Sequence, residues 1–209
     1  MAIPDHPLHS AGSISSEPVP SPLGISFGEF LKHPLKVGSA FPASDRMVRR
    51  MLAPIKWGAV GLCIEYGPGT GVFTRAILSR LPRSATLLAV DTSREFTRHL
   101  QRHIDDPRLR AVTGTAADIE QIAARLGLGQ ADAILSGLPF STLPQETAAA
   151  IVASSAQLLR PGGHFLAYQM RAAVHPHLTR HFARVDKGFE WWNIPPCHLY
   201  WATGPRRSR

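Results

Sequence analysis

Cysteine, acidic residues and long apolar runs are all in short supply in this 209-residue chain. Its two cysteines, Cys63 and Cys197, do not form a CxxC pair, so the sequence suggests no zinc or redox site built on cysteine. No apolar stretch is long enough to span a bilayer, and the amino terminus lacks the basic start and apolar segment of a signal peptide. These absences fit a reducing compartment, and we expect a cytoplasmic protein.

The shortage of acidic residues leaves the chain strongly basic. Lysine and arginine number 23 against 15 aspartates and glutamates, which gives a formal charge of +8. Such a balance favours an anionic partner, either nucleic acid or an anionic membrane surface. A basic surface that only aids solubility is the alternative, and composition does not separate the two.

The amino-terminal region divides into a tail and an amphipathic segment. Residues 1–24 are rich in Pro, Ser and Gly and are expected to be disordered. Residues 25–58 are expected to form helices that contact a membrane or cover the active site as a lid. The side chains expected to contact a membrane are an apolar stripe and two lysines beside it: Phe27, Phe30, Leu31, Leu35, Lys32 and Lys36.

A strict alternation of strands and helices begins at residue 59 and predicts one α/β catalytic domain over residues 59–209. Near-continuous apolar strands separated by helices are typical of a parallel sheet covered on both faces. The last two expected strands have no helix between them, so they should form an antiparallel edge. The expected strands are 59–66, 85–91, 109–114, 131–137, 164–170, 181–191 and 196–203.

The first strand ends in a glycine-rich loop, "EYGPGTG", over residues 65–71. Gly67 and Gly69 match the start of a dinucleotide fingerprint, G-x-G-x-x-G, but its third glycine would fall on Val72. Glu65 would repel a pyrophosphate and attract an ammonium group. The loop resembles motif I of class I S-adenosylmethionine (SAM) dependent methyltransferases; a plain glycine turn is the alternative interpretation.

That resemblance implies a Rossmann-like fold with a seven-stranded mixed sheet, and SAM as cofactor. Glu65 would serve the amino group of SAM, and Asp91, at the end of the second strand, the ribose hydroxyls. Asp118 would read the adenine amino group, and Ala117 would line the ring. As alternatives, Asp91 and Asp118 could each cap a helix. The complete expected cofactor set is Glu65, Gly67, Gly69, Gly71, Asp91, Thr92, Ala117, Asp118 and Ser136.

The segment "SGLPF", residues 136–140, follows the fourth strand. It resembles the Asn-Leu-Pro-Tyr motif of rRNA adenine dimethylases, but Gly137 stands where that Asn would be and Phe140 replaces the Tyr. Only backbone carbonyls around Gly137 and Leu138 are left to hold the target nitrogen. Tyr168, near the end of the fifth strand, is the best-placed polar side chain to orient an amine, although a purely packing role is an alternative.

Several segments together resemble bacterial phospholipid N-methyltransferases, which make phosphatidylcholine from phosphatidylethanolamine. They are "HPLKVGSAFPAS", "SGLP" and the late N-x-P-P of "WWNIPPCHLYWAT". The resemblance implies methyl transfer from SAM to a phosphatidylethanolamine amine by an enzyme bound peripherally to the inner face of the cytoplasmic membrane. The alternatives are an rRNA adenine N6-dimethyltransferase-like enzyme, and a non-catalytic SAM- or membrane-binding module.

No metal site is expected. His175, His177 and His181 form H-x-H-x3-H, but Pro176 stands between the first two, so no regular helix is expected to present them together. The sequence offers them no acidic or cysteine partners.

Overall fold

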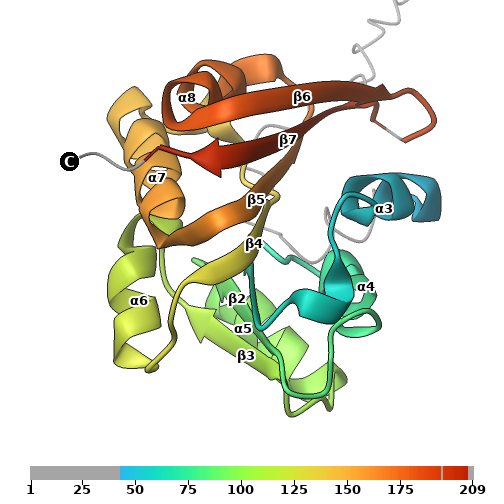
Figure 1. The fold of residues 1–209 in the computed structure, drawn as a ribbon. Coiled ribbons are helices and arrows are strands. Elements are labelled where there is room, and N and C mark those ends of the chain that lie inside the picture. The colour runs from blue at the N-terminus through green and yellow to red at the C-terminus, as the bar shows by residue number, and fades with distance from the viewer. Residues whose placement is uncertain (1–42, 194, 207–209) are drawn as a thin grey trace, which may run out of the picture.

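The protein is described here from a computed structural model, which defines residues 43–193 and 195–206. Within them a seven-stranded sheet has the order β3-β2-β1-β4-β5-β7-β6 (Figure 1). Five strands are parallel: β1 (Leu62–Tyr66), β2 (Thr86–Asp91), β3 (Leu109–Thr113), β4 (Ala131–Ser136) and β5 (Leu159–Gln169). The last two, β6 (Phe182–Glu190) and β7 (Cys197–Pro205), form the antiparallel edge. The predicted mixed α/β sheet and its antiparallel edge are therefore confirmed.

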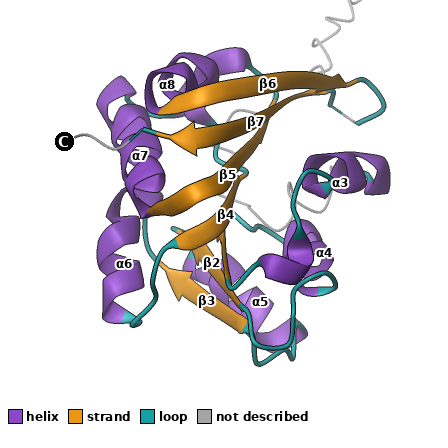
Figure 2. Cartoon of the chain, in the orientation of Figure 1, coloured by secondary structure: helices purple, strands orange, loops and turns teal. Residues whose placement is uncertain are grey.

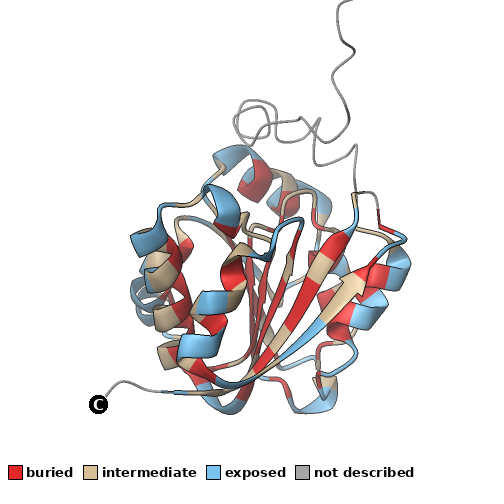
Figure 3. Ribbon diagram, turned by 90° about the horizontal axis from the view of Figure 1, so that it is seen from above, coloured by how far each residue is buried: buried red, intermediate tan, exposed pale blue. Residues whose placement is uncertain are grey.

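Helices cover both faces of the sheet (Figure 2). The face that packs Ile64, Ile134 and Phe165 is covered by α6 (Ile119–Arg125), α7 (Gln145–Leu158) and α8 (His175–His181). The opposite face is covered by α3 (Asp45–Leu52) and α4 (Val72–Leu78), and α5 (Arg94–His103) packs on β2 and β3. The central strands are buried from both sides (Figure 3), which is why they read as continuous apolar runs.

Helix α3 is part of the core. The Ser44 side chain accepts a hydrogen bond from the Met47 N–H and caps the helix. Its buried side chains, Met47, Val48, Met51 and Leu52, pack with Phe73 of α4 and Leu166 of β5. The carboxyl-terminal part of the 25–58 region thus contributes to the domain's stability.

Short 3-10 turns lie between the main elements, and one helix differs from the sequence prediction. The turns are Trp57–Ala59, Ala116–Asp118, Phe140–Thr142 and Ala172–Val174. Helix α8 does carry His175, His177 and His181 on one regular helix, so the expectation that Pro176 would prevent this was wrong. Pro176 lies in the first turn, where a helix has no use for its missing N–H.

The fifth strand is longer than predicted. It begins at Leu159, directly after α7, and its pairing with β4 shifts register between Ala131 and Ala133. In the part of the chain that the structure describes, no helix is both long and apolar enough to cross a membrane.

Candidate functional site

The carboxyl ends of β1, β2, β4 and β5 bring most of the predicted site residues to one edge of the sheet. The Gly67 N–H donates to the Val90 carbonyl at 2.9 Å, and the Gly137 N–H donates to the Tyr66 carbonyl at 2.9 Å. These bonds extend the strand pairing into the loops that follow. The glycine loop and the "SGLPF" loop therefore lie side by side, as ligand-binding loops do in open α/β sheets.

Positive backbone angles explain the glycines of the first loop. Gly67, Gly69 and Gly71 have φ values of 64°, 55° and 85°, a region that side-chain-bearing residues rarely adopt. A Cβ on Gly71 would lie 2.6 Å from Leu100 Cδ2, so this glycine also lets α5 approach. Among the described residues, a Cβ on Gly69 would meet no atom within 4 Å. In the part of the chain that the structure describes, the middle of the loop thus faces open space in which a ligand can approach the backbone.

Glu65 lies at the floor of this loop. Its side chain is 2% exposed, and its carboxylate accepts a 2.7 Å hydrogen bond from the Thr74 hydroxyl of α4. Burial raises its pKa to about 7, which the Thr74 bond partly opposes. A buried carboxylate of this kind gains from a cationic partner, because an ammonium group would favour its charged form.

Asp91 closes the second side of the loop. Its carboxylate accepts hydrogen bonds from the backbone N–H groups of Ser93, at 2.8 Å, and Gly69. Burial raises the pKa of Asp91, and these two bonds oppose the rise. The cap of α5 is Ser93, not Asp91. Asp91 thus connects the glycine loop to the end of β2. The ribose of a bound nucleoside would lie at this position.

The other predicted cofactor residues divide into two groups. Thr92 and Asp118 are exposed and Ala117 is partly exposed at the same edge, and Asp118 makes no side-chain capping bond to α6. These three are free to face a ligand. Ser136 is fully buried, and its hydroxyl accepts from the Leu138 N–H at 3.3 Å. It shapes the second loop from within.

Tyr168 explains why position 137 is a glycine. A Cβ on Gly137 would overlap the Tyr168 hydroxyl and lie 2.9 Å from the phenol Cζ. The Tyr168 ring stacks on Phe73 with centroids 4.8 Å apart. The phenol of β5 therefore occupies the space that a side chain at position 137 would take, which is where the Asn of the rRNA-type motif would begin.

The charge state of Tyr168 is set by its surroundings. Burial raises its pKa, and the nearby Glu65 and Asp91 carboxylates raise it further. The phenol stays neutral near pH 7, so it can donate or accept a hydrogen bond but cannot act as a phenolate base.

The two other predicted substrate residues are more enclosed than expected. The Leu138 carbonyl already accepts two hydrogen bonds, from the Gln169 side chain at 2.8 Å and from the Phe140 N–H at 3.0 Å, which occupy both of its lone pairs. Phe140 is 3% exposed and packs in the core, so it does not present its ring at the surface. Within the described residues no hydrogen bond reaches the Gly137 carbonyl, which makes it the more available acceptor.

Sequence reasoning missed three buried polar residues near the site. Gln169 braces the second loop and also accepts from the Val174 N–H. Glu190 and Asn193 hold the hairpin between β6 and β7 against α3. The N-x-P-P segment contained a signal for Asn193, but nothing in the sequence marked its partner, Ser44.

Two further predictions from the sequence concern membrane contact and metal binding. The predicted membrane residues Phe27, Phe30, Leu31, Lys32 and Lys36 lie outside the described part of the chain. No group of three His, Cys, Asp or Glu side chains within the described residues is arranged to hold a metal ion. The three histidines of α8 therefore have no such partners in the described chain.

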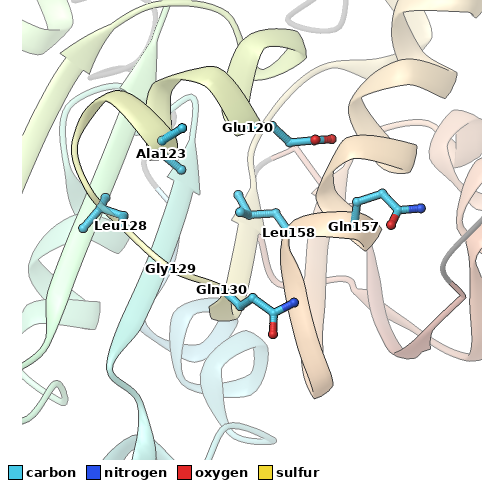
Figure 4. A pocket seen from close by; sticks show the side chains of 8 residues that line it. Glu120, Ala123, Leu128, Gly129, Gln130, Gln157 and Leu158 are labelled. Carbon is cyan, nitrogen blue, oxygen red and sulfur yellow. The ribbon is translucent and has the colours of Figure 1, made fainter.

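A hollow of about 280 Å³ lies elsewhere, between α6, the turn before β4 and the end of α7 (Figure 4). It is lined by Glu120, Ala123, Leu128, Gln130 and their neighbours. It opens where β4 begins, at the opposite edge from the glycine loop. Its position separates it from the candidate site.

The geometry and charge of the site residues fit SAM. A loop with open space above Gly69, a buried carboxylate suited to an ammonium group and a second carboxylate at the end of β2 match a zwitterionic amino acid joined to a nucleoside.

Comparisons with known proteins agree with this geometry. Residues 63–163 match the family model described as a methyltransferase domain. The chain is 30% identical over 186 residues to the ornithine lipid N-methyltransferase of Singulisphaera acidiphila, covering 88% of this chain and 97% of that protein. It is 27% identical over 106 residues to ribosomal RNA small subunit methyltransferase A of Acidithiobacillus ferrooxidans, but spans 38% of that protein.

Solved structures show the same fold. The N-methyltransferase NodS of Bradyrhizobium japonicum, in complex with S-adenosyl-L-homocysteine, superposes with a TM-score of 0.60 at 16% identity, covering 85% of this chain and 88% of that one. A SAM-dependent O-methyltransferase of Thermotoga maritima gives a TM-score of 0.62 at 10% identity, covering 86% and 73%.

Proposed function

Because this chain belongs to the class I SAM-dependent methyltransferases, we propose that it transfers methyl groups from SAM to the amine of a membrane lipid. The observation that carries the proposal is the match to a lipid N-methyltransferase along nearly that protein's whole length. The basic charge of +8 supports it, since an enzyme that works on lipids must approach an anionic surface.

Two lipid amines are candidates. Phosphatidylethanolamine is the substrate that the sequence resemblance implied, and the product would lie on the route to phosphatidylcholine. The ornithine lipid is favoured by the name of the matched relative. Both present a primary amine beside a lipid headgroup, so the same chemistry serves either.

The reaction needs a neutral amine. A lysine-like amine has a pKa of about 10.4, so deprotonating it at pH 7 costs roughly 4–5 kcal/mol. Desolvation beside hydrogen-bond acceptors offsets part of this cost. When bound, SAM would supply an electrophilic methyl group to the amine lone pair, with S-adenosylhomocysteine as the leaving group, and the ammonium product would then release a proton to solvent.

In this proposal, different residues at the carboxyl end of the sheet bind SAM and the amine. Glu65, Asp91 and the glycine loop would hold SAM, with Ala117 and Asp118 beside the adenine. Tyr168 and the Gly137 carbonyl would accept hydrogen bonds from the amine and aim its lone pair. Tyr168 is well suited because its neutral phenol lies beside Gly137.

The rRNA alternative has weaker support. The match to ribosomal RNA methyltransferase A covers 38% of that protein, and the Asn of its motif is replaced here by a glycine whose space is filled by Tyr168. The chain lacks room at position 137 for the amide that would hold an adenine nitrogen.

Turnover of radiolabelled SAM tests the proposal. The purified protein is incubated with vesicles containing phosphatidylethanolamine, vesicles containing ornithine lipid, phosphatidylcholine vesicles or rRNA. We expect label only in an amine-containing lipid, and the lipid that is labelled identifies the substrate. Label in rRNA alone would establish the alternative, and SAM binding without label anywhere would indicate a non-catalytic module.

A further inference from the structure

The large apolar side chains that stand exposed in the described chain all lie at one edge of the sheet. They are Met170, Trp191 and Trp192, with exposed fractions of 61%, 73% and 77%. Met170 directly follows β5, and the two tryptophans follow β6. Singly exposed apolar residues are ordinary, but three gathered at one edge need an explanation.

These side chains lie at the same end of the sheet as the candidate site, where the parallel strands have their carboxyl ends. The β5 and β7 pairing sets Gln169 opposite His198, and the β6 and β7 pairing sets Glu190 opposite Cys197. The described start of the hairpin turn, residues 191–193, therefore lies beyond the carboxyl end of β5, the strand that carries Tyr168. Figure 1 shows this turn at the far end of β6 and β7, on the same side as α3.

The hairpin turn is held in place by buried polar contacts. Glu190 is 1% exposed and pairs with Arg46 at 3.2 Å and Arg50 at 3.3 Å, both on α3. Asn193 is 5% exposed; its side-chain oxygen accepts from the Ser44 N–H at 3.0 Å and its amide donates to the Pro195 carbonyl at 3.0 Å. The polar residues are thus turned inward while the two tryptophans are turned outward.

Trp191 is also braced by its own strand. Its ring packs edge-on against Phe189 with centroids 4.4 Å apart, and Phe189 packs in the same way on His198 at 4.8 Å. A side chain supported on one side and 73% exposed on the other loses little further freedom when it enters a new environment.

Positive charge surrounds these apolar side chains. Arg46 and Arg50 keep 64% and 41% of their side chains exposed while they pair with Glu190. Arg49 is exposed on the same helix, and exposed Arg171 follows Met170. Two arginines on one buried carboxylate leave a net positive charge. Tryptophan with arginine beside it is the combination favoured at the interface between lipid headgroups and acyl chains.

From this arrangement we propose that Trp191 and Trp192, together with Met170, insert into the surface of an anionic membrane. Trp191 and Trp192 enter the interfacial layer, and the arginines contact lipid phosphates. The carboxyl edge of the sheet, with Tyr168 and Gly137, then faces the lipid headgroups. This inference deepens the proposed function by naming where the membrane is contacted, and it requires no contact from residues 1–42.

The test measures binding without catalysis. The full chain is mixed with phosphatidylcholine–phosphatidylglycerol vesicles that contain no amine lipid, without SAM, and bound protein is separated by sedimentation. Trp191→Glu/Trp192→Glu should weaken partitioning by at least about tenfold, since two tryptophans lose their burial. Ala124→Glu/Gln130→Glu adds the same two charges at exposed positions on the opposite edge, and it should bind as the wild type does.

Fluorescence quenching by brominated lipids tests the insertion of the two tryptophans independently. Vesicles containing dibrominated phosphatidylcholine should quench the wild-type tryptophan emission. Trp191→Phe/Trp192→Phe keeps the turn apolar and retains Trp57 and Trp201, which donate to backbone carbonyls away from the turn. Its emission should not be quenched.

Three results would overturn the inference: no binding to anionic vesicles, unchanged binding of the double Glu variant, or unquenched wild-type emission. If Phe27→Glu/Phe30→Glu shifts that unquenched emission to the red, the turn is covered by residues 25–37 of the chain itself. Because no substrate is present, a failure of lipid methylation leaves these results unaffected, and a failure of binding leaves the turnover experiment unaffected.

Discussion

The two halves of the candidate site are built in different ways. The cofactor half, formed by Glu65, the glycine loop and Asp91, comes from one strand–loop–helix unit and the end of the neighbouring strand. The acceptor half is formed by Gly137, Tyr168 and Gln169, which belong to segments about thirty residues apart. The first half can be read from a short motif, whereas the second exists only after β4 and β5 have paired.

This difference suggests how the two halves can vary. In the proposed function, the cofactor half would hold a fixed ligand with backbone groups and carboxylates, which would constrain its residue types locally. In the acceptor half, a side chain from β5 fills the space left by a glycine after β4. The two halves should therefore respond to substitution in separable ways.

Gly137→Ala should have the largest effect, because it damages the acceptor half. The new Cβ would overlap the Tyr168 hydroxyl, and overpacking of this kind costs about 1–3 kcal/mol of unfolding free energy. The clash should shift both Tyr168 and the Gly137 carbonyl, and a misplacement of the bound amine by about 1 Å should lower kcat roughly 100-fold. Chemical denaturation and turnover measure the two effects.

Combining Gly137→Ala with Tyr168→Phe tests the cause. Removing the nearest atom should make the double variant more stable than the sum of the two single changes predicts. Strict additivity would show that Tyr168 is not what requires a glycine at position 137.

Asp91→Ala damages the cofactor half alone. The carboxylate bonds proposed for the ribose are worth roughly 1.5–3 kcal/mol each, so SAM affinity should fall at least tenfold. Calorimetry with SAM measures this directly. The vesicle affinity of the variant should match the wild type, and an unchanged SAM affinity would remove Asp91 from the site.

Glu65 should make the stability of the ligand-free protein depend on pH. Its pKa is raised from 4.5 to about 7, so its favourable contribution is complete below pH 4.5 and is lost as the pH rises through 7. Between about pH 5.5 and about pH 8 the loss should be about 2 kcal/mol. Denaturant unfolding at both pH values should show the loss in the wild type but not in Glu65→Gln.

Glu65→Gln also probes the ligand. If the carboxylate faces an ammonium group, the variant should bind SAM more weakly at pH 8 than the wild type does. A protein that instead bound NAD or ATP better than SAM would contradict the interpretation of the glycine loop.

Tyr168→Phe should have the smallest effect, because it removes a single oxygen from the acceptor half. If the phenol orients the amine, kcat should fall roughly tenfold, the equivalent of one neutral hydrogen bond, while SAM affinity is unchanged. Equal turnover in the two proteins would support a purely packing role against Phe73.

Pattern alone predicted most of the fold. The alternation of apolar strands and helices located all seven strands, and the absence of a helix before the last strand predicted the antiparallel edge. Prediction failed at α8, because a proline read as a helix breaker is tolerated in a first turn. It also missed the early start of β5, where "RPGG" gave no strand signal.

The sequence by itself predicted the residues of the cofactor half. Positive φ values call for glycine, and a carboxylate at the end of a buried strand suits an ammonium group, so a few neighbouring residues and their resemblance to motif I carry that prediction. These requirements concern residues that are close together in the chain, so a short sequence motif can reveal them.

Only the tertiary structure decided the acceptor half and the hairpin turn. In the sequence, Gly137 marks only the loss of an asparagine, whereas in the structure Tyr168 occupies the space that a side chain at this position would take. Asn193 belongs to the N-x-P-P motif in the sequence, and in the structure its side chain accepts a hydrogen bond from the N–H of Ser44, 149 positions away. Likewise, Trp191 and Trp192 are ordinary aromatics in the sequence, and only the inward pairing of Glu190 with α3 leaves them outside. Contacts between distant segments form when the sheet assembles, so no short stretch of sequence can specify them.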